Sequence, residues 1–227
     1  MVSSNNVIIS SIEILPDQAN KIINWYEINI MGDRFCSKYD NYYYPMYNNN
    51  QLLIVSFPKK IKKNIITSSS NLGFNLVHLS VDIFSTAVFA QHLYRESITE
   101  EFVLWKICRN NMHKIVTYKN KLIHSYLEVR KQSDKYIKSF GIGDSNQIDK
   151  LISLVNNTLI DKKKYKELEN IFIYQTKENK SIINNKINVN KKIKILSLNS
   201  ILQHSENNEF KYMSYVENGI CFKGLDL

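Results

Sequence analysis

The stretch Gln51–Gly73, QLLIVSFPKKIKKNIITSSSNLG, carries the clearest structural signal in the chain. It opens with an almost continuously apolar, β-branched run, which is typical of a short strand buried on both faces. Pro58 ends that run and can open a helix, because a first helical turn does not use its N–H. We expect Gly73 to end the helix. Isoleucines at helical spacing predict the buried face of this helix, namely Ile61, Ile65 and Ile66.

The residues before this stretch predict a second strand and an amphipathic helix. Val7–Leu15 is an apolar, β-branched run that ends at a proline, as a strand would. Apolar residues then recur at helical spacing from Ala19 to Ile30, and we expect Gly32 to end that helix. The tyrosine-rich segment 35–47 predicts a strand with aromatic faces.

The residues after it predict alternating strands and helices. Residues 74–83 predict a strand, and 84–94 follow a helical pattern. Three strands should come next, with Asn120 taking a positive φ in the tight turn between the last two. Their ranges are 102–107, 114–118 and 122–129.

The C-terminal part predicts one more helix and two short strands. Gly141 and Gly143 indicate a loop, and Asp144 with Gln147 resembles a capping box. The core stripe of the following helix should comprise Ile148, Leu151, Ile152, Val155 and Leu159. Short strands are expected at 171–174 and 193–198, a polar stretch between them, and an ordered apolar tail at 210–222. Strands that alternate with helices predict an α/β or α+β fold.

Composition places the chain among ordinary globular proteins. It has 227 residues, 44% hydrophobic and 22% charged, with only 6 Gly and 3 Pro, which excludes collagen-like and low-complexity proteins. No run of about 18 apolar residues and no secretory signal pattern is found, so we expect no membrane span. Three scattered cysteines do not form a disulfide framework and fit a reducing cytosol.

The net charge of +9 leaves a nucleic-acid-binding protein as an alternative. Tyrosines beside lysines could form a base-stacking platform, built from Tyr39, Tyr42, Tyr43, Tyr44 and Tyr47. We favour an aromatic-lined strand and solvated lysine clusters, because abundant Asn, Ile, Lys and Tyr indicate the codon bias of an AT-rich genome. The clusters lie at 59–63, 162–164 and 191–192.

The chemistry-bearing residues form no recognisable catalytic or metal site. Phosphate-cradling motifs are missing, and the glycines before the last helix more readily mark a capped loop than an anion site. The five histidines, such as His78 and His124, have no ligand partner at a metal-binding spacing. Asp82 ends a predicted strand and could serve a nuclease-like site, but we favour capping of the following helix. Glu128 joins no recognisable carboxylate set.

Five segments in this order resemble a known family. They are Ile8–Pro16 with Trp25 in the following helix, Leu52–Phe74, Val77–Ala90, Tyr118–Leu122 and Asn218–Leu225. The pattern resembles the type IV pilus assembly protein PilM, an actin-like relative of the cell-division protein FtsA and of the cytoplasmic part of the secretion protein GspL. The resemblance implies a truncated actin-like, ribonuclease H-like α/β fold. Residues 1–76 would be a small inserted strand-helix-strand subdomain, and residues 77–227 a ribonuclease H-like lobe.

The chain departs from the family pattern where nucleotide would bind. The family opens with a Gly-x-Asp-x-Gly phosphate hairpin, and this chain would start after it. Leu104–Arg109 stands where a second Asp-x-Gly is expected, and Gln175–Glu178 replaces a Gly-Gly loop. Those turns need glycine for close backbone approach and aspartate for the metal. We therefore expect a pseudo-ATPase, and assign no catalytic, cofactor-binding or metal-binding residue.

The resemblance implies a non-catalytic scaffold in a type IV pilus or type II secretion platform. Its partner would be the cytoplasmic tail of a PilN-like or GspM-like bitopic inner-membrane protein, held in an apolar groove bordering the small subdomain. The protein would be cytoplasmic and reach the inner membrane through that partner. A homo-oligomer or ring is compatible with this role.

Overall fold

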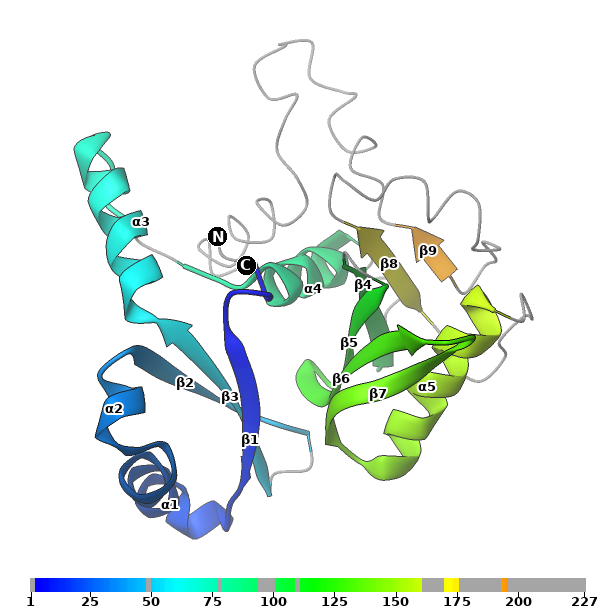
Figure 1. The fold of residues 1–227 in the computed structure, drawn as a ribbon, viewed down its shortest axis with the longest axis horizontal. Helices are drawn as coiled ribbons and strands as arrows, with labels where there is room; N and C mark the ends of the chain where they lie inside the picture. Colours follow the sequence, from blue (N-terminus) through cyan, green and yellow to red (C-terminus); the bar gives the residue numbers. More distant parts are fainter. Residues whose placement is uncertain are drawn as a thin grey trace. The chain divides into compact units, whose positions relative to one another are not determined.

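The computed structural model describes residues 3–47, 50–76, 79–93, 101–108, 111–160, 170–175 and 193–195. The chain divides into two compact units, Met1–Asp82 and Ile83–Leu227 (Figure 1). The segments 177–190 and 210–222, for which we expected a polar stretch and an ordered tail, lie outside the described residues.

The first unit is built on a three-stranded antiparallel sheet with the order β1–β3–β2. The strands are β1 (Ile8–Glu13), β2 (Tyr39–Pro45) and β3 (Gln51–Pro58). The apolar run that predicted a buried strand is the central strand β3, and this prediction is confirmed. Leu53 and Ile54 are fully buried there, because a central strand has neighbours on both edges and side chains packed on both faces.

Helical turns between β1 and β2 cover one face of this sheet. A 3-10 turn (Pro16–Gln18) leads into α1 (Ala19–Tyr26), a π-helical turn (Glu27–Met31) and α2 (Gly32–Cys36). Ile22, Ile23 and Tyr26 pack against the sheet core. Gly32, at φ 71°, ends the π-helical turn, but a further helical turn follows, so the prediction that helix ends there is only partly right.

Helix α3 (Lys59–Asn71) follows β3 directly, and Gly73 ends it with a φ of 78°, as predicted. The predicted buried face is wrong, because no residue of α3 is buried and Ile66 is 42% exposed. The physical reason is that α3 continues beyond the end of β3 instead of lying across the sheet (Figure 1).

The predicted strand at 74–83 is also wrong within the described residues. Only Val81 forms an isolated bridge, and α4 (Asp82–Leu93) begins at the next residue. Phe74 and Leu76 are exposed and belong to no strand, so a segment with apolar residues here has no neighbouring strand to pair with. The helical pattern that follows is confirmed through residue 93.

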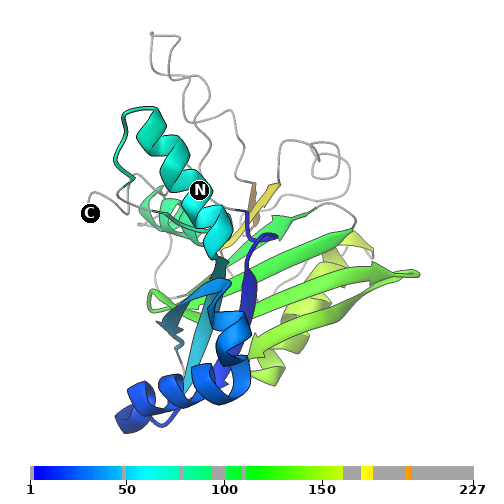
Figure 2. The same ribbon diagram turned by 60° about the vertical axis from the view of Figure 1, so that its left-hand side comes forward.

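The second unit holds a six-stranded sheet with the order β7–β6–β5–β4–β8–β9 (Figure 2). Strands β4 to β7 form an antiparallel meander, and β8 and β9 continue it in parallel from β4. Asn120 in the β5–β6 turn has a φ of 49°, as predicted. The bounds are β4 (Glu101–Ile107), β5 (Met112–Lys119), β6 (Leu122–Gln132), β7 (Lys135–Gly143), β8 (Ile171–Gln175) and β9 (Ile193–Ile195).

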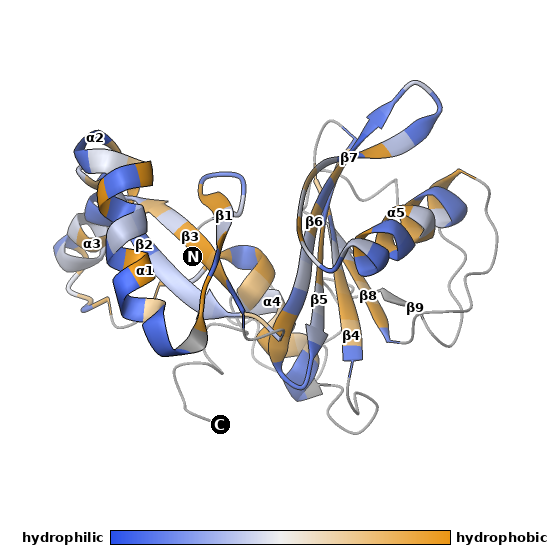
Figure 3. Ribbon diagram, turned by 90° about the horizontal axis from the view of Figure 1, so that it is seen from below, coloured by the Kyte–Doolittle hydropathy of each residue, from blue (hydrophilic) through white to orange (hydrophobic). Residues whose placement is uncertain are grey.

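Helix α5 (Ser145–Leu159) packs on one face of this sheet and completes the core. Ile148, Leu151, Val155 and Leu159 are buried as predicted, with Leu154 in addition and Ile152 partly covered. Figure 3 shows the apolar character concentrated in β4 and β8, whereas the far end of the β6–β7 hairpin is hydrophilic. Buried central strands need apolar residues on both faces, and the hairpin tip does not.

Strand β7 corrects the prediction of a loop at Gly141 and Gly143. Both glycines lie within the strand, where they allow close packing. A Cβ on Gly141 would lie 3.4 Å from Ile148 Cδ1, and a Cβ on Gly143 would lie 2.7 Å from the carbonyl oxygen of His124. The glycines therefore mark close approach of α5 and β6, not a turn.

Asp144 is the N-cap of α5, as predicted, and its Oδ1 accepts a hydrogen bond of 3.0 Å from the backbone N–H of Gln147. We expect Asp144→Ala to lower the free energy of unfolding by about 1 kcal/mol, because one helix N–H loses its acceptor. Asp149→Ala, in the same helix and exposed, should change it by less than about 0.5 kcal/mol. Urea unfolding monitors both; equal losses would contradict the capping role.

Candidate functional site: a polar groove beside β2

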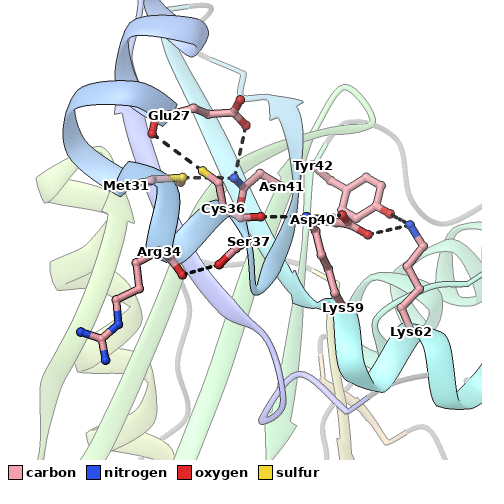
Figure 4. Close-up of polar contacts among 10 residues, drawn as sticks. All are labelled: Glu27, Met31, Arg34, Cys36, Ser37, Asp40, Asn41, Tyr42, Lys59 and Lys62. Atoms are coloured by element: carbon pink, nitrogen blue, oxygen red, sulfur yellow. Dashed lines mark hydrogen bonds and ion pairs between the residues drawn. The ribbon is translucent and has the colours of Figure 1, made fainter.

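The first unit carries an open pocket of about 420 Å³ beside β2, which we call the β2 groove. It lies where the end of α2, the start of β2 and the first turn of α3 meet (Figure 4). Its lining comprises Glu27, Cys36, Tyr39, Asp40, Asn41, Tyr42, Lys59 and Lys62.

An ion-pair cluster centred on Asp40 forms one side of the groove. Lys62 Nζ lies 2.7 Å from Asp40 Oδ2 and donates to the Tyr42 hydroxyl at 3.0 Å. These two hydrogen bonds raise the pKa of Lys62 to about 12. Lys59 Nζ lies 3.8 Å from Asp40 Oδ1 and donates to the carbonyl oxygen of Cys36 at 2.8 Å. The cluster ties the start of α3 to β2 and the end of α2.

The carboxylate of Glu27 organises the other side. Its Oε1 accepts hydrogen bonds from the Tyr43 hydroxyl at 2.6 Å and from Asn41 Nδ2 at 3.2 Å. Burial, and then Glu27, raise the pKa of Tyr43 well above its usual range. Glu27 opens the π-helical turn, a distortion that occurs often at functional sites. The turn thus supplies a carboxylate to β2 from a separate segment.

The electrostatics suit recognition better than proton transfer. The resolved pKa shifts in this cluster, on Lys62 and Tyr43, both move away from neutrality. A general acid or base needs a pKa near the working pH. Asp40 is paired with Lys62, so this side of the groove offers hydrogen-bonding groups that are held in place.

Four of the tyrosines predicted to line a strand do so, on both faces of β2, whereas Tyr47 lies in a turn beyond its end. Tyr43 packs toward the core of the first unit, whereas Tyr42 and Tyr44 are exposed. Of the lysine cluster at 59–63, Lys59 and Lys62 line the groove, whereas Lys60 and Lys63 do not. The clusters at 162–164 and 191–192 lie outside the described residues.

The other residues considered as catalytic or metal-binding candidates are Asp82, His78 and His124. Asp82, the buried first residue of α4, accepts a 2.9 Å hydrogen bond from the backbone N–H of Ser4. His124 Nδ1 lies 3.8 Å from Glu101 Oε1, and His78 lies outside the described residues. Within the described ranges, no three His, Cys, Asp or Glu side chains are grouped for a metal.

A cross-strand row of polar side chains in the second unit was not predicted. The strand registers place Lys106, Lys114 and Glu128 side by side on β4, β5 and β6. Lys114 Nζ lies 3.0 Å from Glu128 Oε1, which also accepts a 2.6 Å hydrogen bond from the Tyr126 hydroxyl. Both lysines are buried, so this row is part of the interior of the unit. Cross-strand alignment depends on register, which sequence spacing alone does not give.

Sequence analysis missed the β2 groove because its members come from three separated segments. Glu27 lies on a helical turn, Cys36–Tyr42 on α2 and β2, and Lys59 and Lys62 on α3. The tyrosine strand followed by a lysine-rich helix start was the available signal. Nothing in the spacing indicated that Asp40 would neutralise the lysines.

Comparison with known proteins supports the fold. No protein-family model matches the sequence, and no curated protein matches it. PilM, solved as a PilM–PilN type IV pilus biogenesis complex, is similar with a TM-score of 0.53 at 9% identity, over 98% of this chain and 77% of that chain. The cytoplasmic domain of EpsL, an inner-membrane component of the type II secretion system of Vibrio cholerae, gives a TM-score of 0.45 at 10% identity, over 100% and 73%.

Over 98% of its length the chain is thus structurally similar to PilM. The resemblance seen in the sequence is confirmed at this level, as is the mixed α/β class. At 9% identity the likeness to PilM defines the fold. In the part of the chain that the structure describes, no helix is long and apolar enough to cross a bilayer.

Proposed function

We propose that this protein is a non-catalytic scaffold of a type IV pilus or type II secretion assembly platform. It would bind the cytoplasmic tail of a PilN-like or GspM-like bitopic inner-membrane protein and stay cytoplasmic, peripheral to that membrane. The observation that carries the proposal is the similarity to PilM, whose solved structure is a complex with PilN. The first unit, close in extent to the predicted inserted subdomain 1–76, is the proposed partner-binding part.

The open edge of β2 supports peptide recognition by the first unit. β2 pairs with β3 on one side, and no described strand pairs with its other edge. An exposed strand edge offers backbone N–H and C=O groups to an added strand. Tyr42 and Tyr44 are exposed on this edge strand, and tyrosine is favoured at interfaces because it combines apolar area with a hydroxyl group.

The missing phosphate-binding residues support a role without nucleotide. Neither Leu104–Arg109 nor Gln175–Glu178 contains a glycine or a nearby Asp-x-Gly turn. In the first segment, residues 104–107 form the buried end of β4. At the N-terminus of α5, the Asp144 carboxylate already occupies the cap that an anion would use. The proposal therefore includes no cofactor.

Calorimetric titration with the N-terminal cytoplasmic peptide of a single-span protein encoded beside this gene tests the proposal. We expect binding, and at least a tenfold loss of affinity in Tyr42→Ser/Tyr44→Ser, because two exposed aromatic side chains would be removed from the interface. Ile137→Ser, exposed on β7, is the matched control and should bind normally. Failure of every such peptide to bind overturns the proposal, and unchanged affinity in the double variant overturns the assignment to β2.

The net charge of +9 and the exposed tyrosines of β2 favour nucleic-acid binding as the second candidate. Retention on single-stranded DNA that falls steeply with salt, and is lost in the same tyrosine variant, would support it instead.

A further inference from the structure

Helix α3 ends in an exposed apolar tip. Its 13 residues include none that is buried, although it carries several large apolar side chains. Leu72 is 73% exposed, Phe74 67% and Ile66 42%. Figure 1 shows α3 extending beyond the sheet of its own unit, so the sheet does not cover these side chains. We call Ile66, Leu72 and Phe74 the α3 tip.

The backbone of the tip is held in place by the helix end. Gly73, at φ 78°, donates from its N–H to Ser70 O at 3.0 Å, and Phe74 N–H donates to Ser69 O at 2.9 Å. This pair of bonds is the Schellman motif, in which the residue after the glycine normally packs on an apolar residue of the last turn. Here that turn is Ser68–Ser70, so the positions that normally supply this apolar contact are polar, and Phe74 is 67% exposed.

The other end of α3 is strongly basic. Its first five residues include four lysines, and the helix contains no acidic residue. Lys59 and Lys62 share Asp40, whereas Lys60 and Lys63 have no acidic partner among the described residues. Lys63 lies about 14 Å along the helix from Leu72, since each residue adds 1.5 Å. Along the axis, the chain passes from the lysines, through Ile65, Ile66 and a serine-rich last turn, to the exposed Leu72 and Phe74.

We propose that the α3 tip inserts into an anionic membrane surface, with the lysines held at the phospholipid headgroups. The lysines at one end of α3 and the exposed Leu72 and Phe74 beyond its other end match the order of anionic headgroup and hydrocarbon. Lys60 and Lys63 have no acidic partner among the described residues, and each lysine near an anionic surface contributes about 1 kcal/mol of attraction. A protein partner explains the tip less well, because a stable interface needs about 800 Å² on each side and three side chains do not supply it. This contact is independent of the proposed partner tail.

Vesicle co-sedimentation of the full chain tests the inference, with phosphatidylcholine vesicles compared with vesicles containing phosphatidylglycerol. We expect binding only to the anionic vesicles. Binding should weaken between about 50 and about 500 mM salt, because salt screens the attraction between the lysines and the headgroups. Lys60→Gln/Lys63→Gln should bind about 30-fold more weakly, which corresponds to about 1 kcal/mol for each lysine. Leu72→Ser/Phe74→Ser should abolish binding at every salt concentration.

Matched controls come from the exposed β6–β7 hairpin. Lys131→Gln/Lys135→Gln removes the same charge, and Ile137→Ser removes an exposed apolar side chain from another surface. Both controls should bind as the parent chain does. Equal weakening by the lysine control would overturn the inference, because binding would then depend on the net positive charge of the chain. Absence of binding to anionic vesicles would also overturn it. Self-association in the ultracentrifuge without lipid, lost in the tip variant, would overturn it in favour of a second copy.

Discussion

Gly143→Ala should lower the free energy of unfolding of the second unit by about 3 kcal/mol or more. A Cβ at this position would lie 2.7 Å from the His124 carbonyl oxygen and 2.9 Å from Ser125 Cβ. Because the first obstacle is backbone of the neighbouring strand, β6 and β7 would have to separate. The φ of 111° adds strain that alanine does not tolerate easily.

Alanine substitutions at two other glycines distinguish the effect of the Cβ clash at Gly143 from the effect of its positive φ. Gly141→Ala, in the same strand, would meet only the ends of the Lys138 and Ile148 side chains, at 3.2 and 3.4 Å, and should cost much less. Gly32→Ala has a positive φ but open space around it, so it should show about 1 kcal/mol of strain alone. Urea unfolding measures these losses. The fluorescence of buried Trp105 in a Trp25→Phe background follows the second unit, and far-UV circular dichroism of the whole chain follows Gly32→Ala, which lies in the first unit. Similar losses in Gly141→Ala and Gly143→Ala would contradict the packing argument.

The second large effect is a loss of stability in mild acid caused by His113. This side chain is 1% exposed, accepts a 3.1 Å hydrogen bond on Nδ1 from Trp105 Nε1–H, and meets the Tyr136 ring edge to face. Burial lowers the pKa of His113 from 6.5 to about 3. The folded protein therefore keeps this imidazole neutral at pH values where the unfolded chain protonates it.

The sign follows from proton uptake on unfolding. Above pH 6.5 neither state binds the proton, so this contribution to stability is complete. As the pH falls from 6.5 toward about 3, the unfolded state alone gains the proton, and the free energy of unfolding falls. At pH 5 the loss should be about 2 kcal/mol, from 1.36 kcal/mol for each pH unit.

Unfolding curves at pH 7 and pH 5 measure this loss, and His113→Phe should remove about 2 kcal/mol of the difference between them. The variant will be less stable at pH 7, because the Trp105 N–H loses its acceptor, so the pH dependence is the informative quantity. An unaltered pH dependence in His113→Phe would contradict the assignment.

Elements set by local chemistry were predictable from the sequence. The apolar run of β3, the positive φ of Asn120 and the cap of Asp144 each depend on residues close together in the chain. The division into 1–76 and 77–227 stays a prediction, because the contacts that separate the units at Asp82 do not identify either one as inserted.

Features set by tertiary contacts were not predictable. The sequence predicted a loop at Gly141 and Gly143, but these glycines allow close packing within β7. That role depends on which atoms lie opposite them in the fold. The apolar residues of α3 predicted a core face, but burial also requires a surface to pack against. The β2 groove depends on Glu27 and Asp40 meeting residues more than 15 positions away, which no local pattern encodes.

The π-helical turn at Glu27–Met31 holds one residue more than an α-helical path would need. Loss of a single residue there would restore a regular helix and turn one flank by about 100° relative to the other. Either α1 would then no longer pack on the sheet, or the Glu27 carboxylate would move out of hydrogen-bonding distance of Tyr43. The groove can therefore be gained or lost among related chains by a change in length alone, with every lining side chain kept.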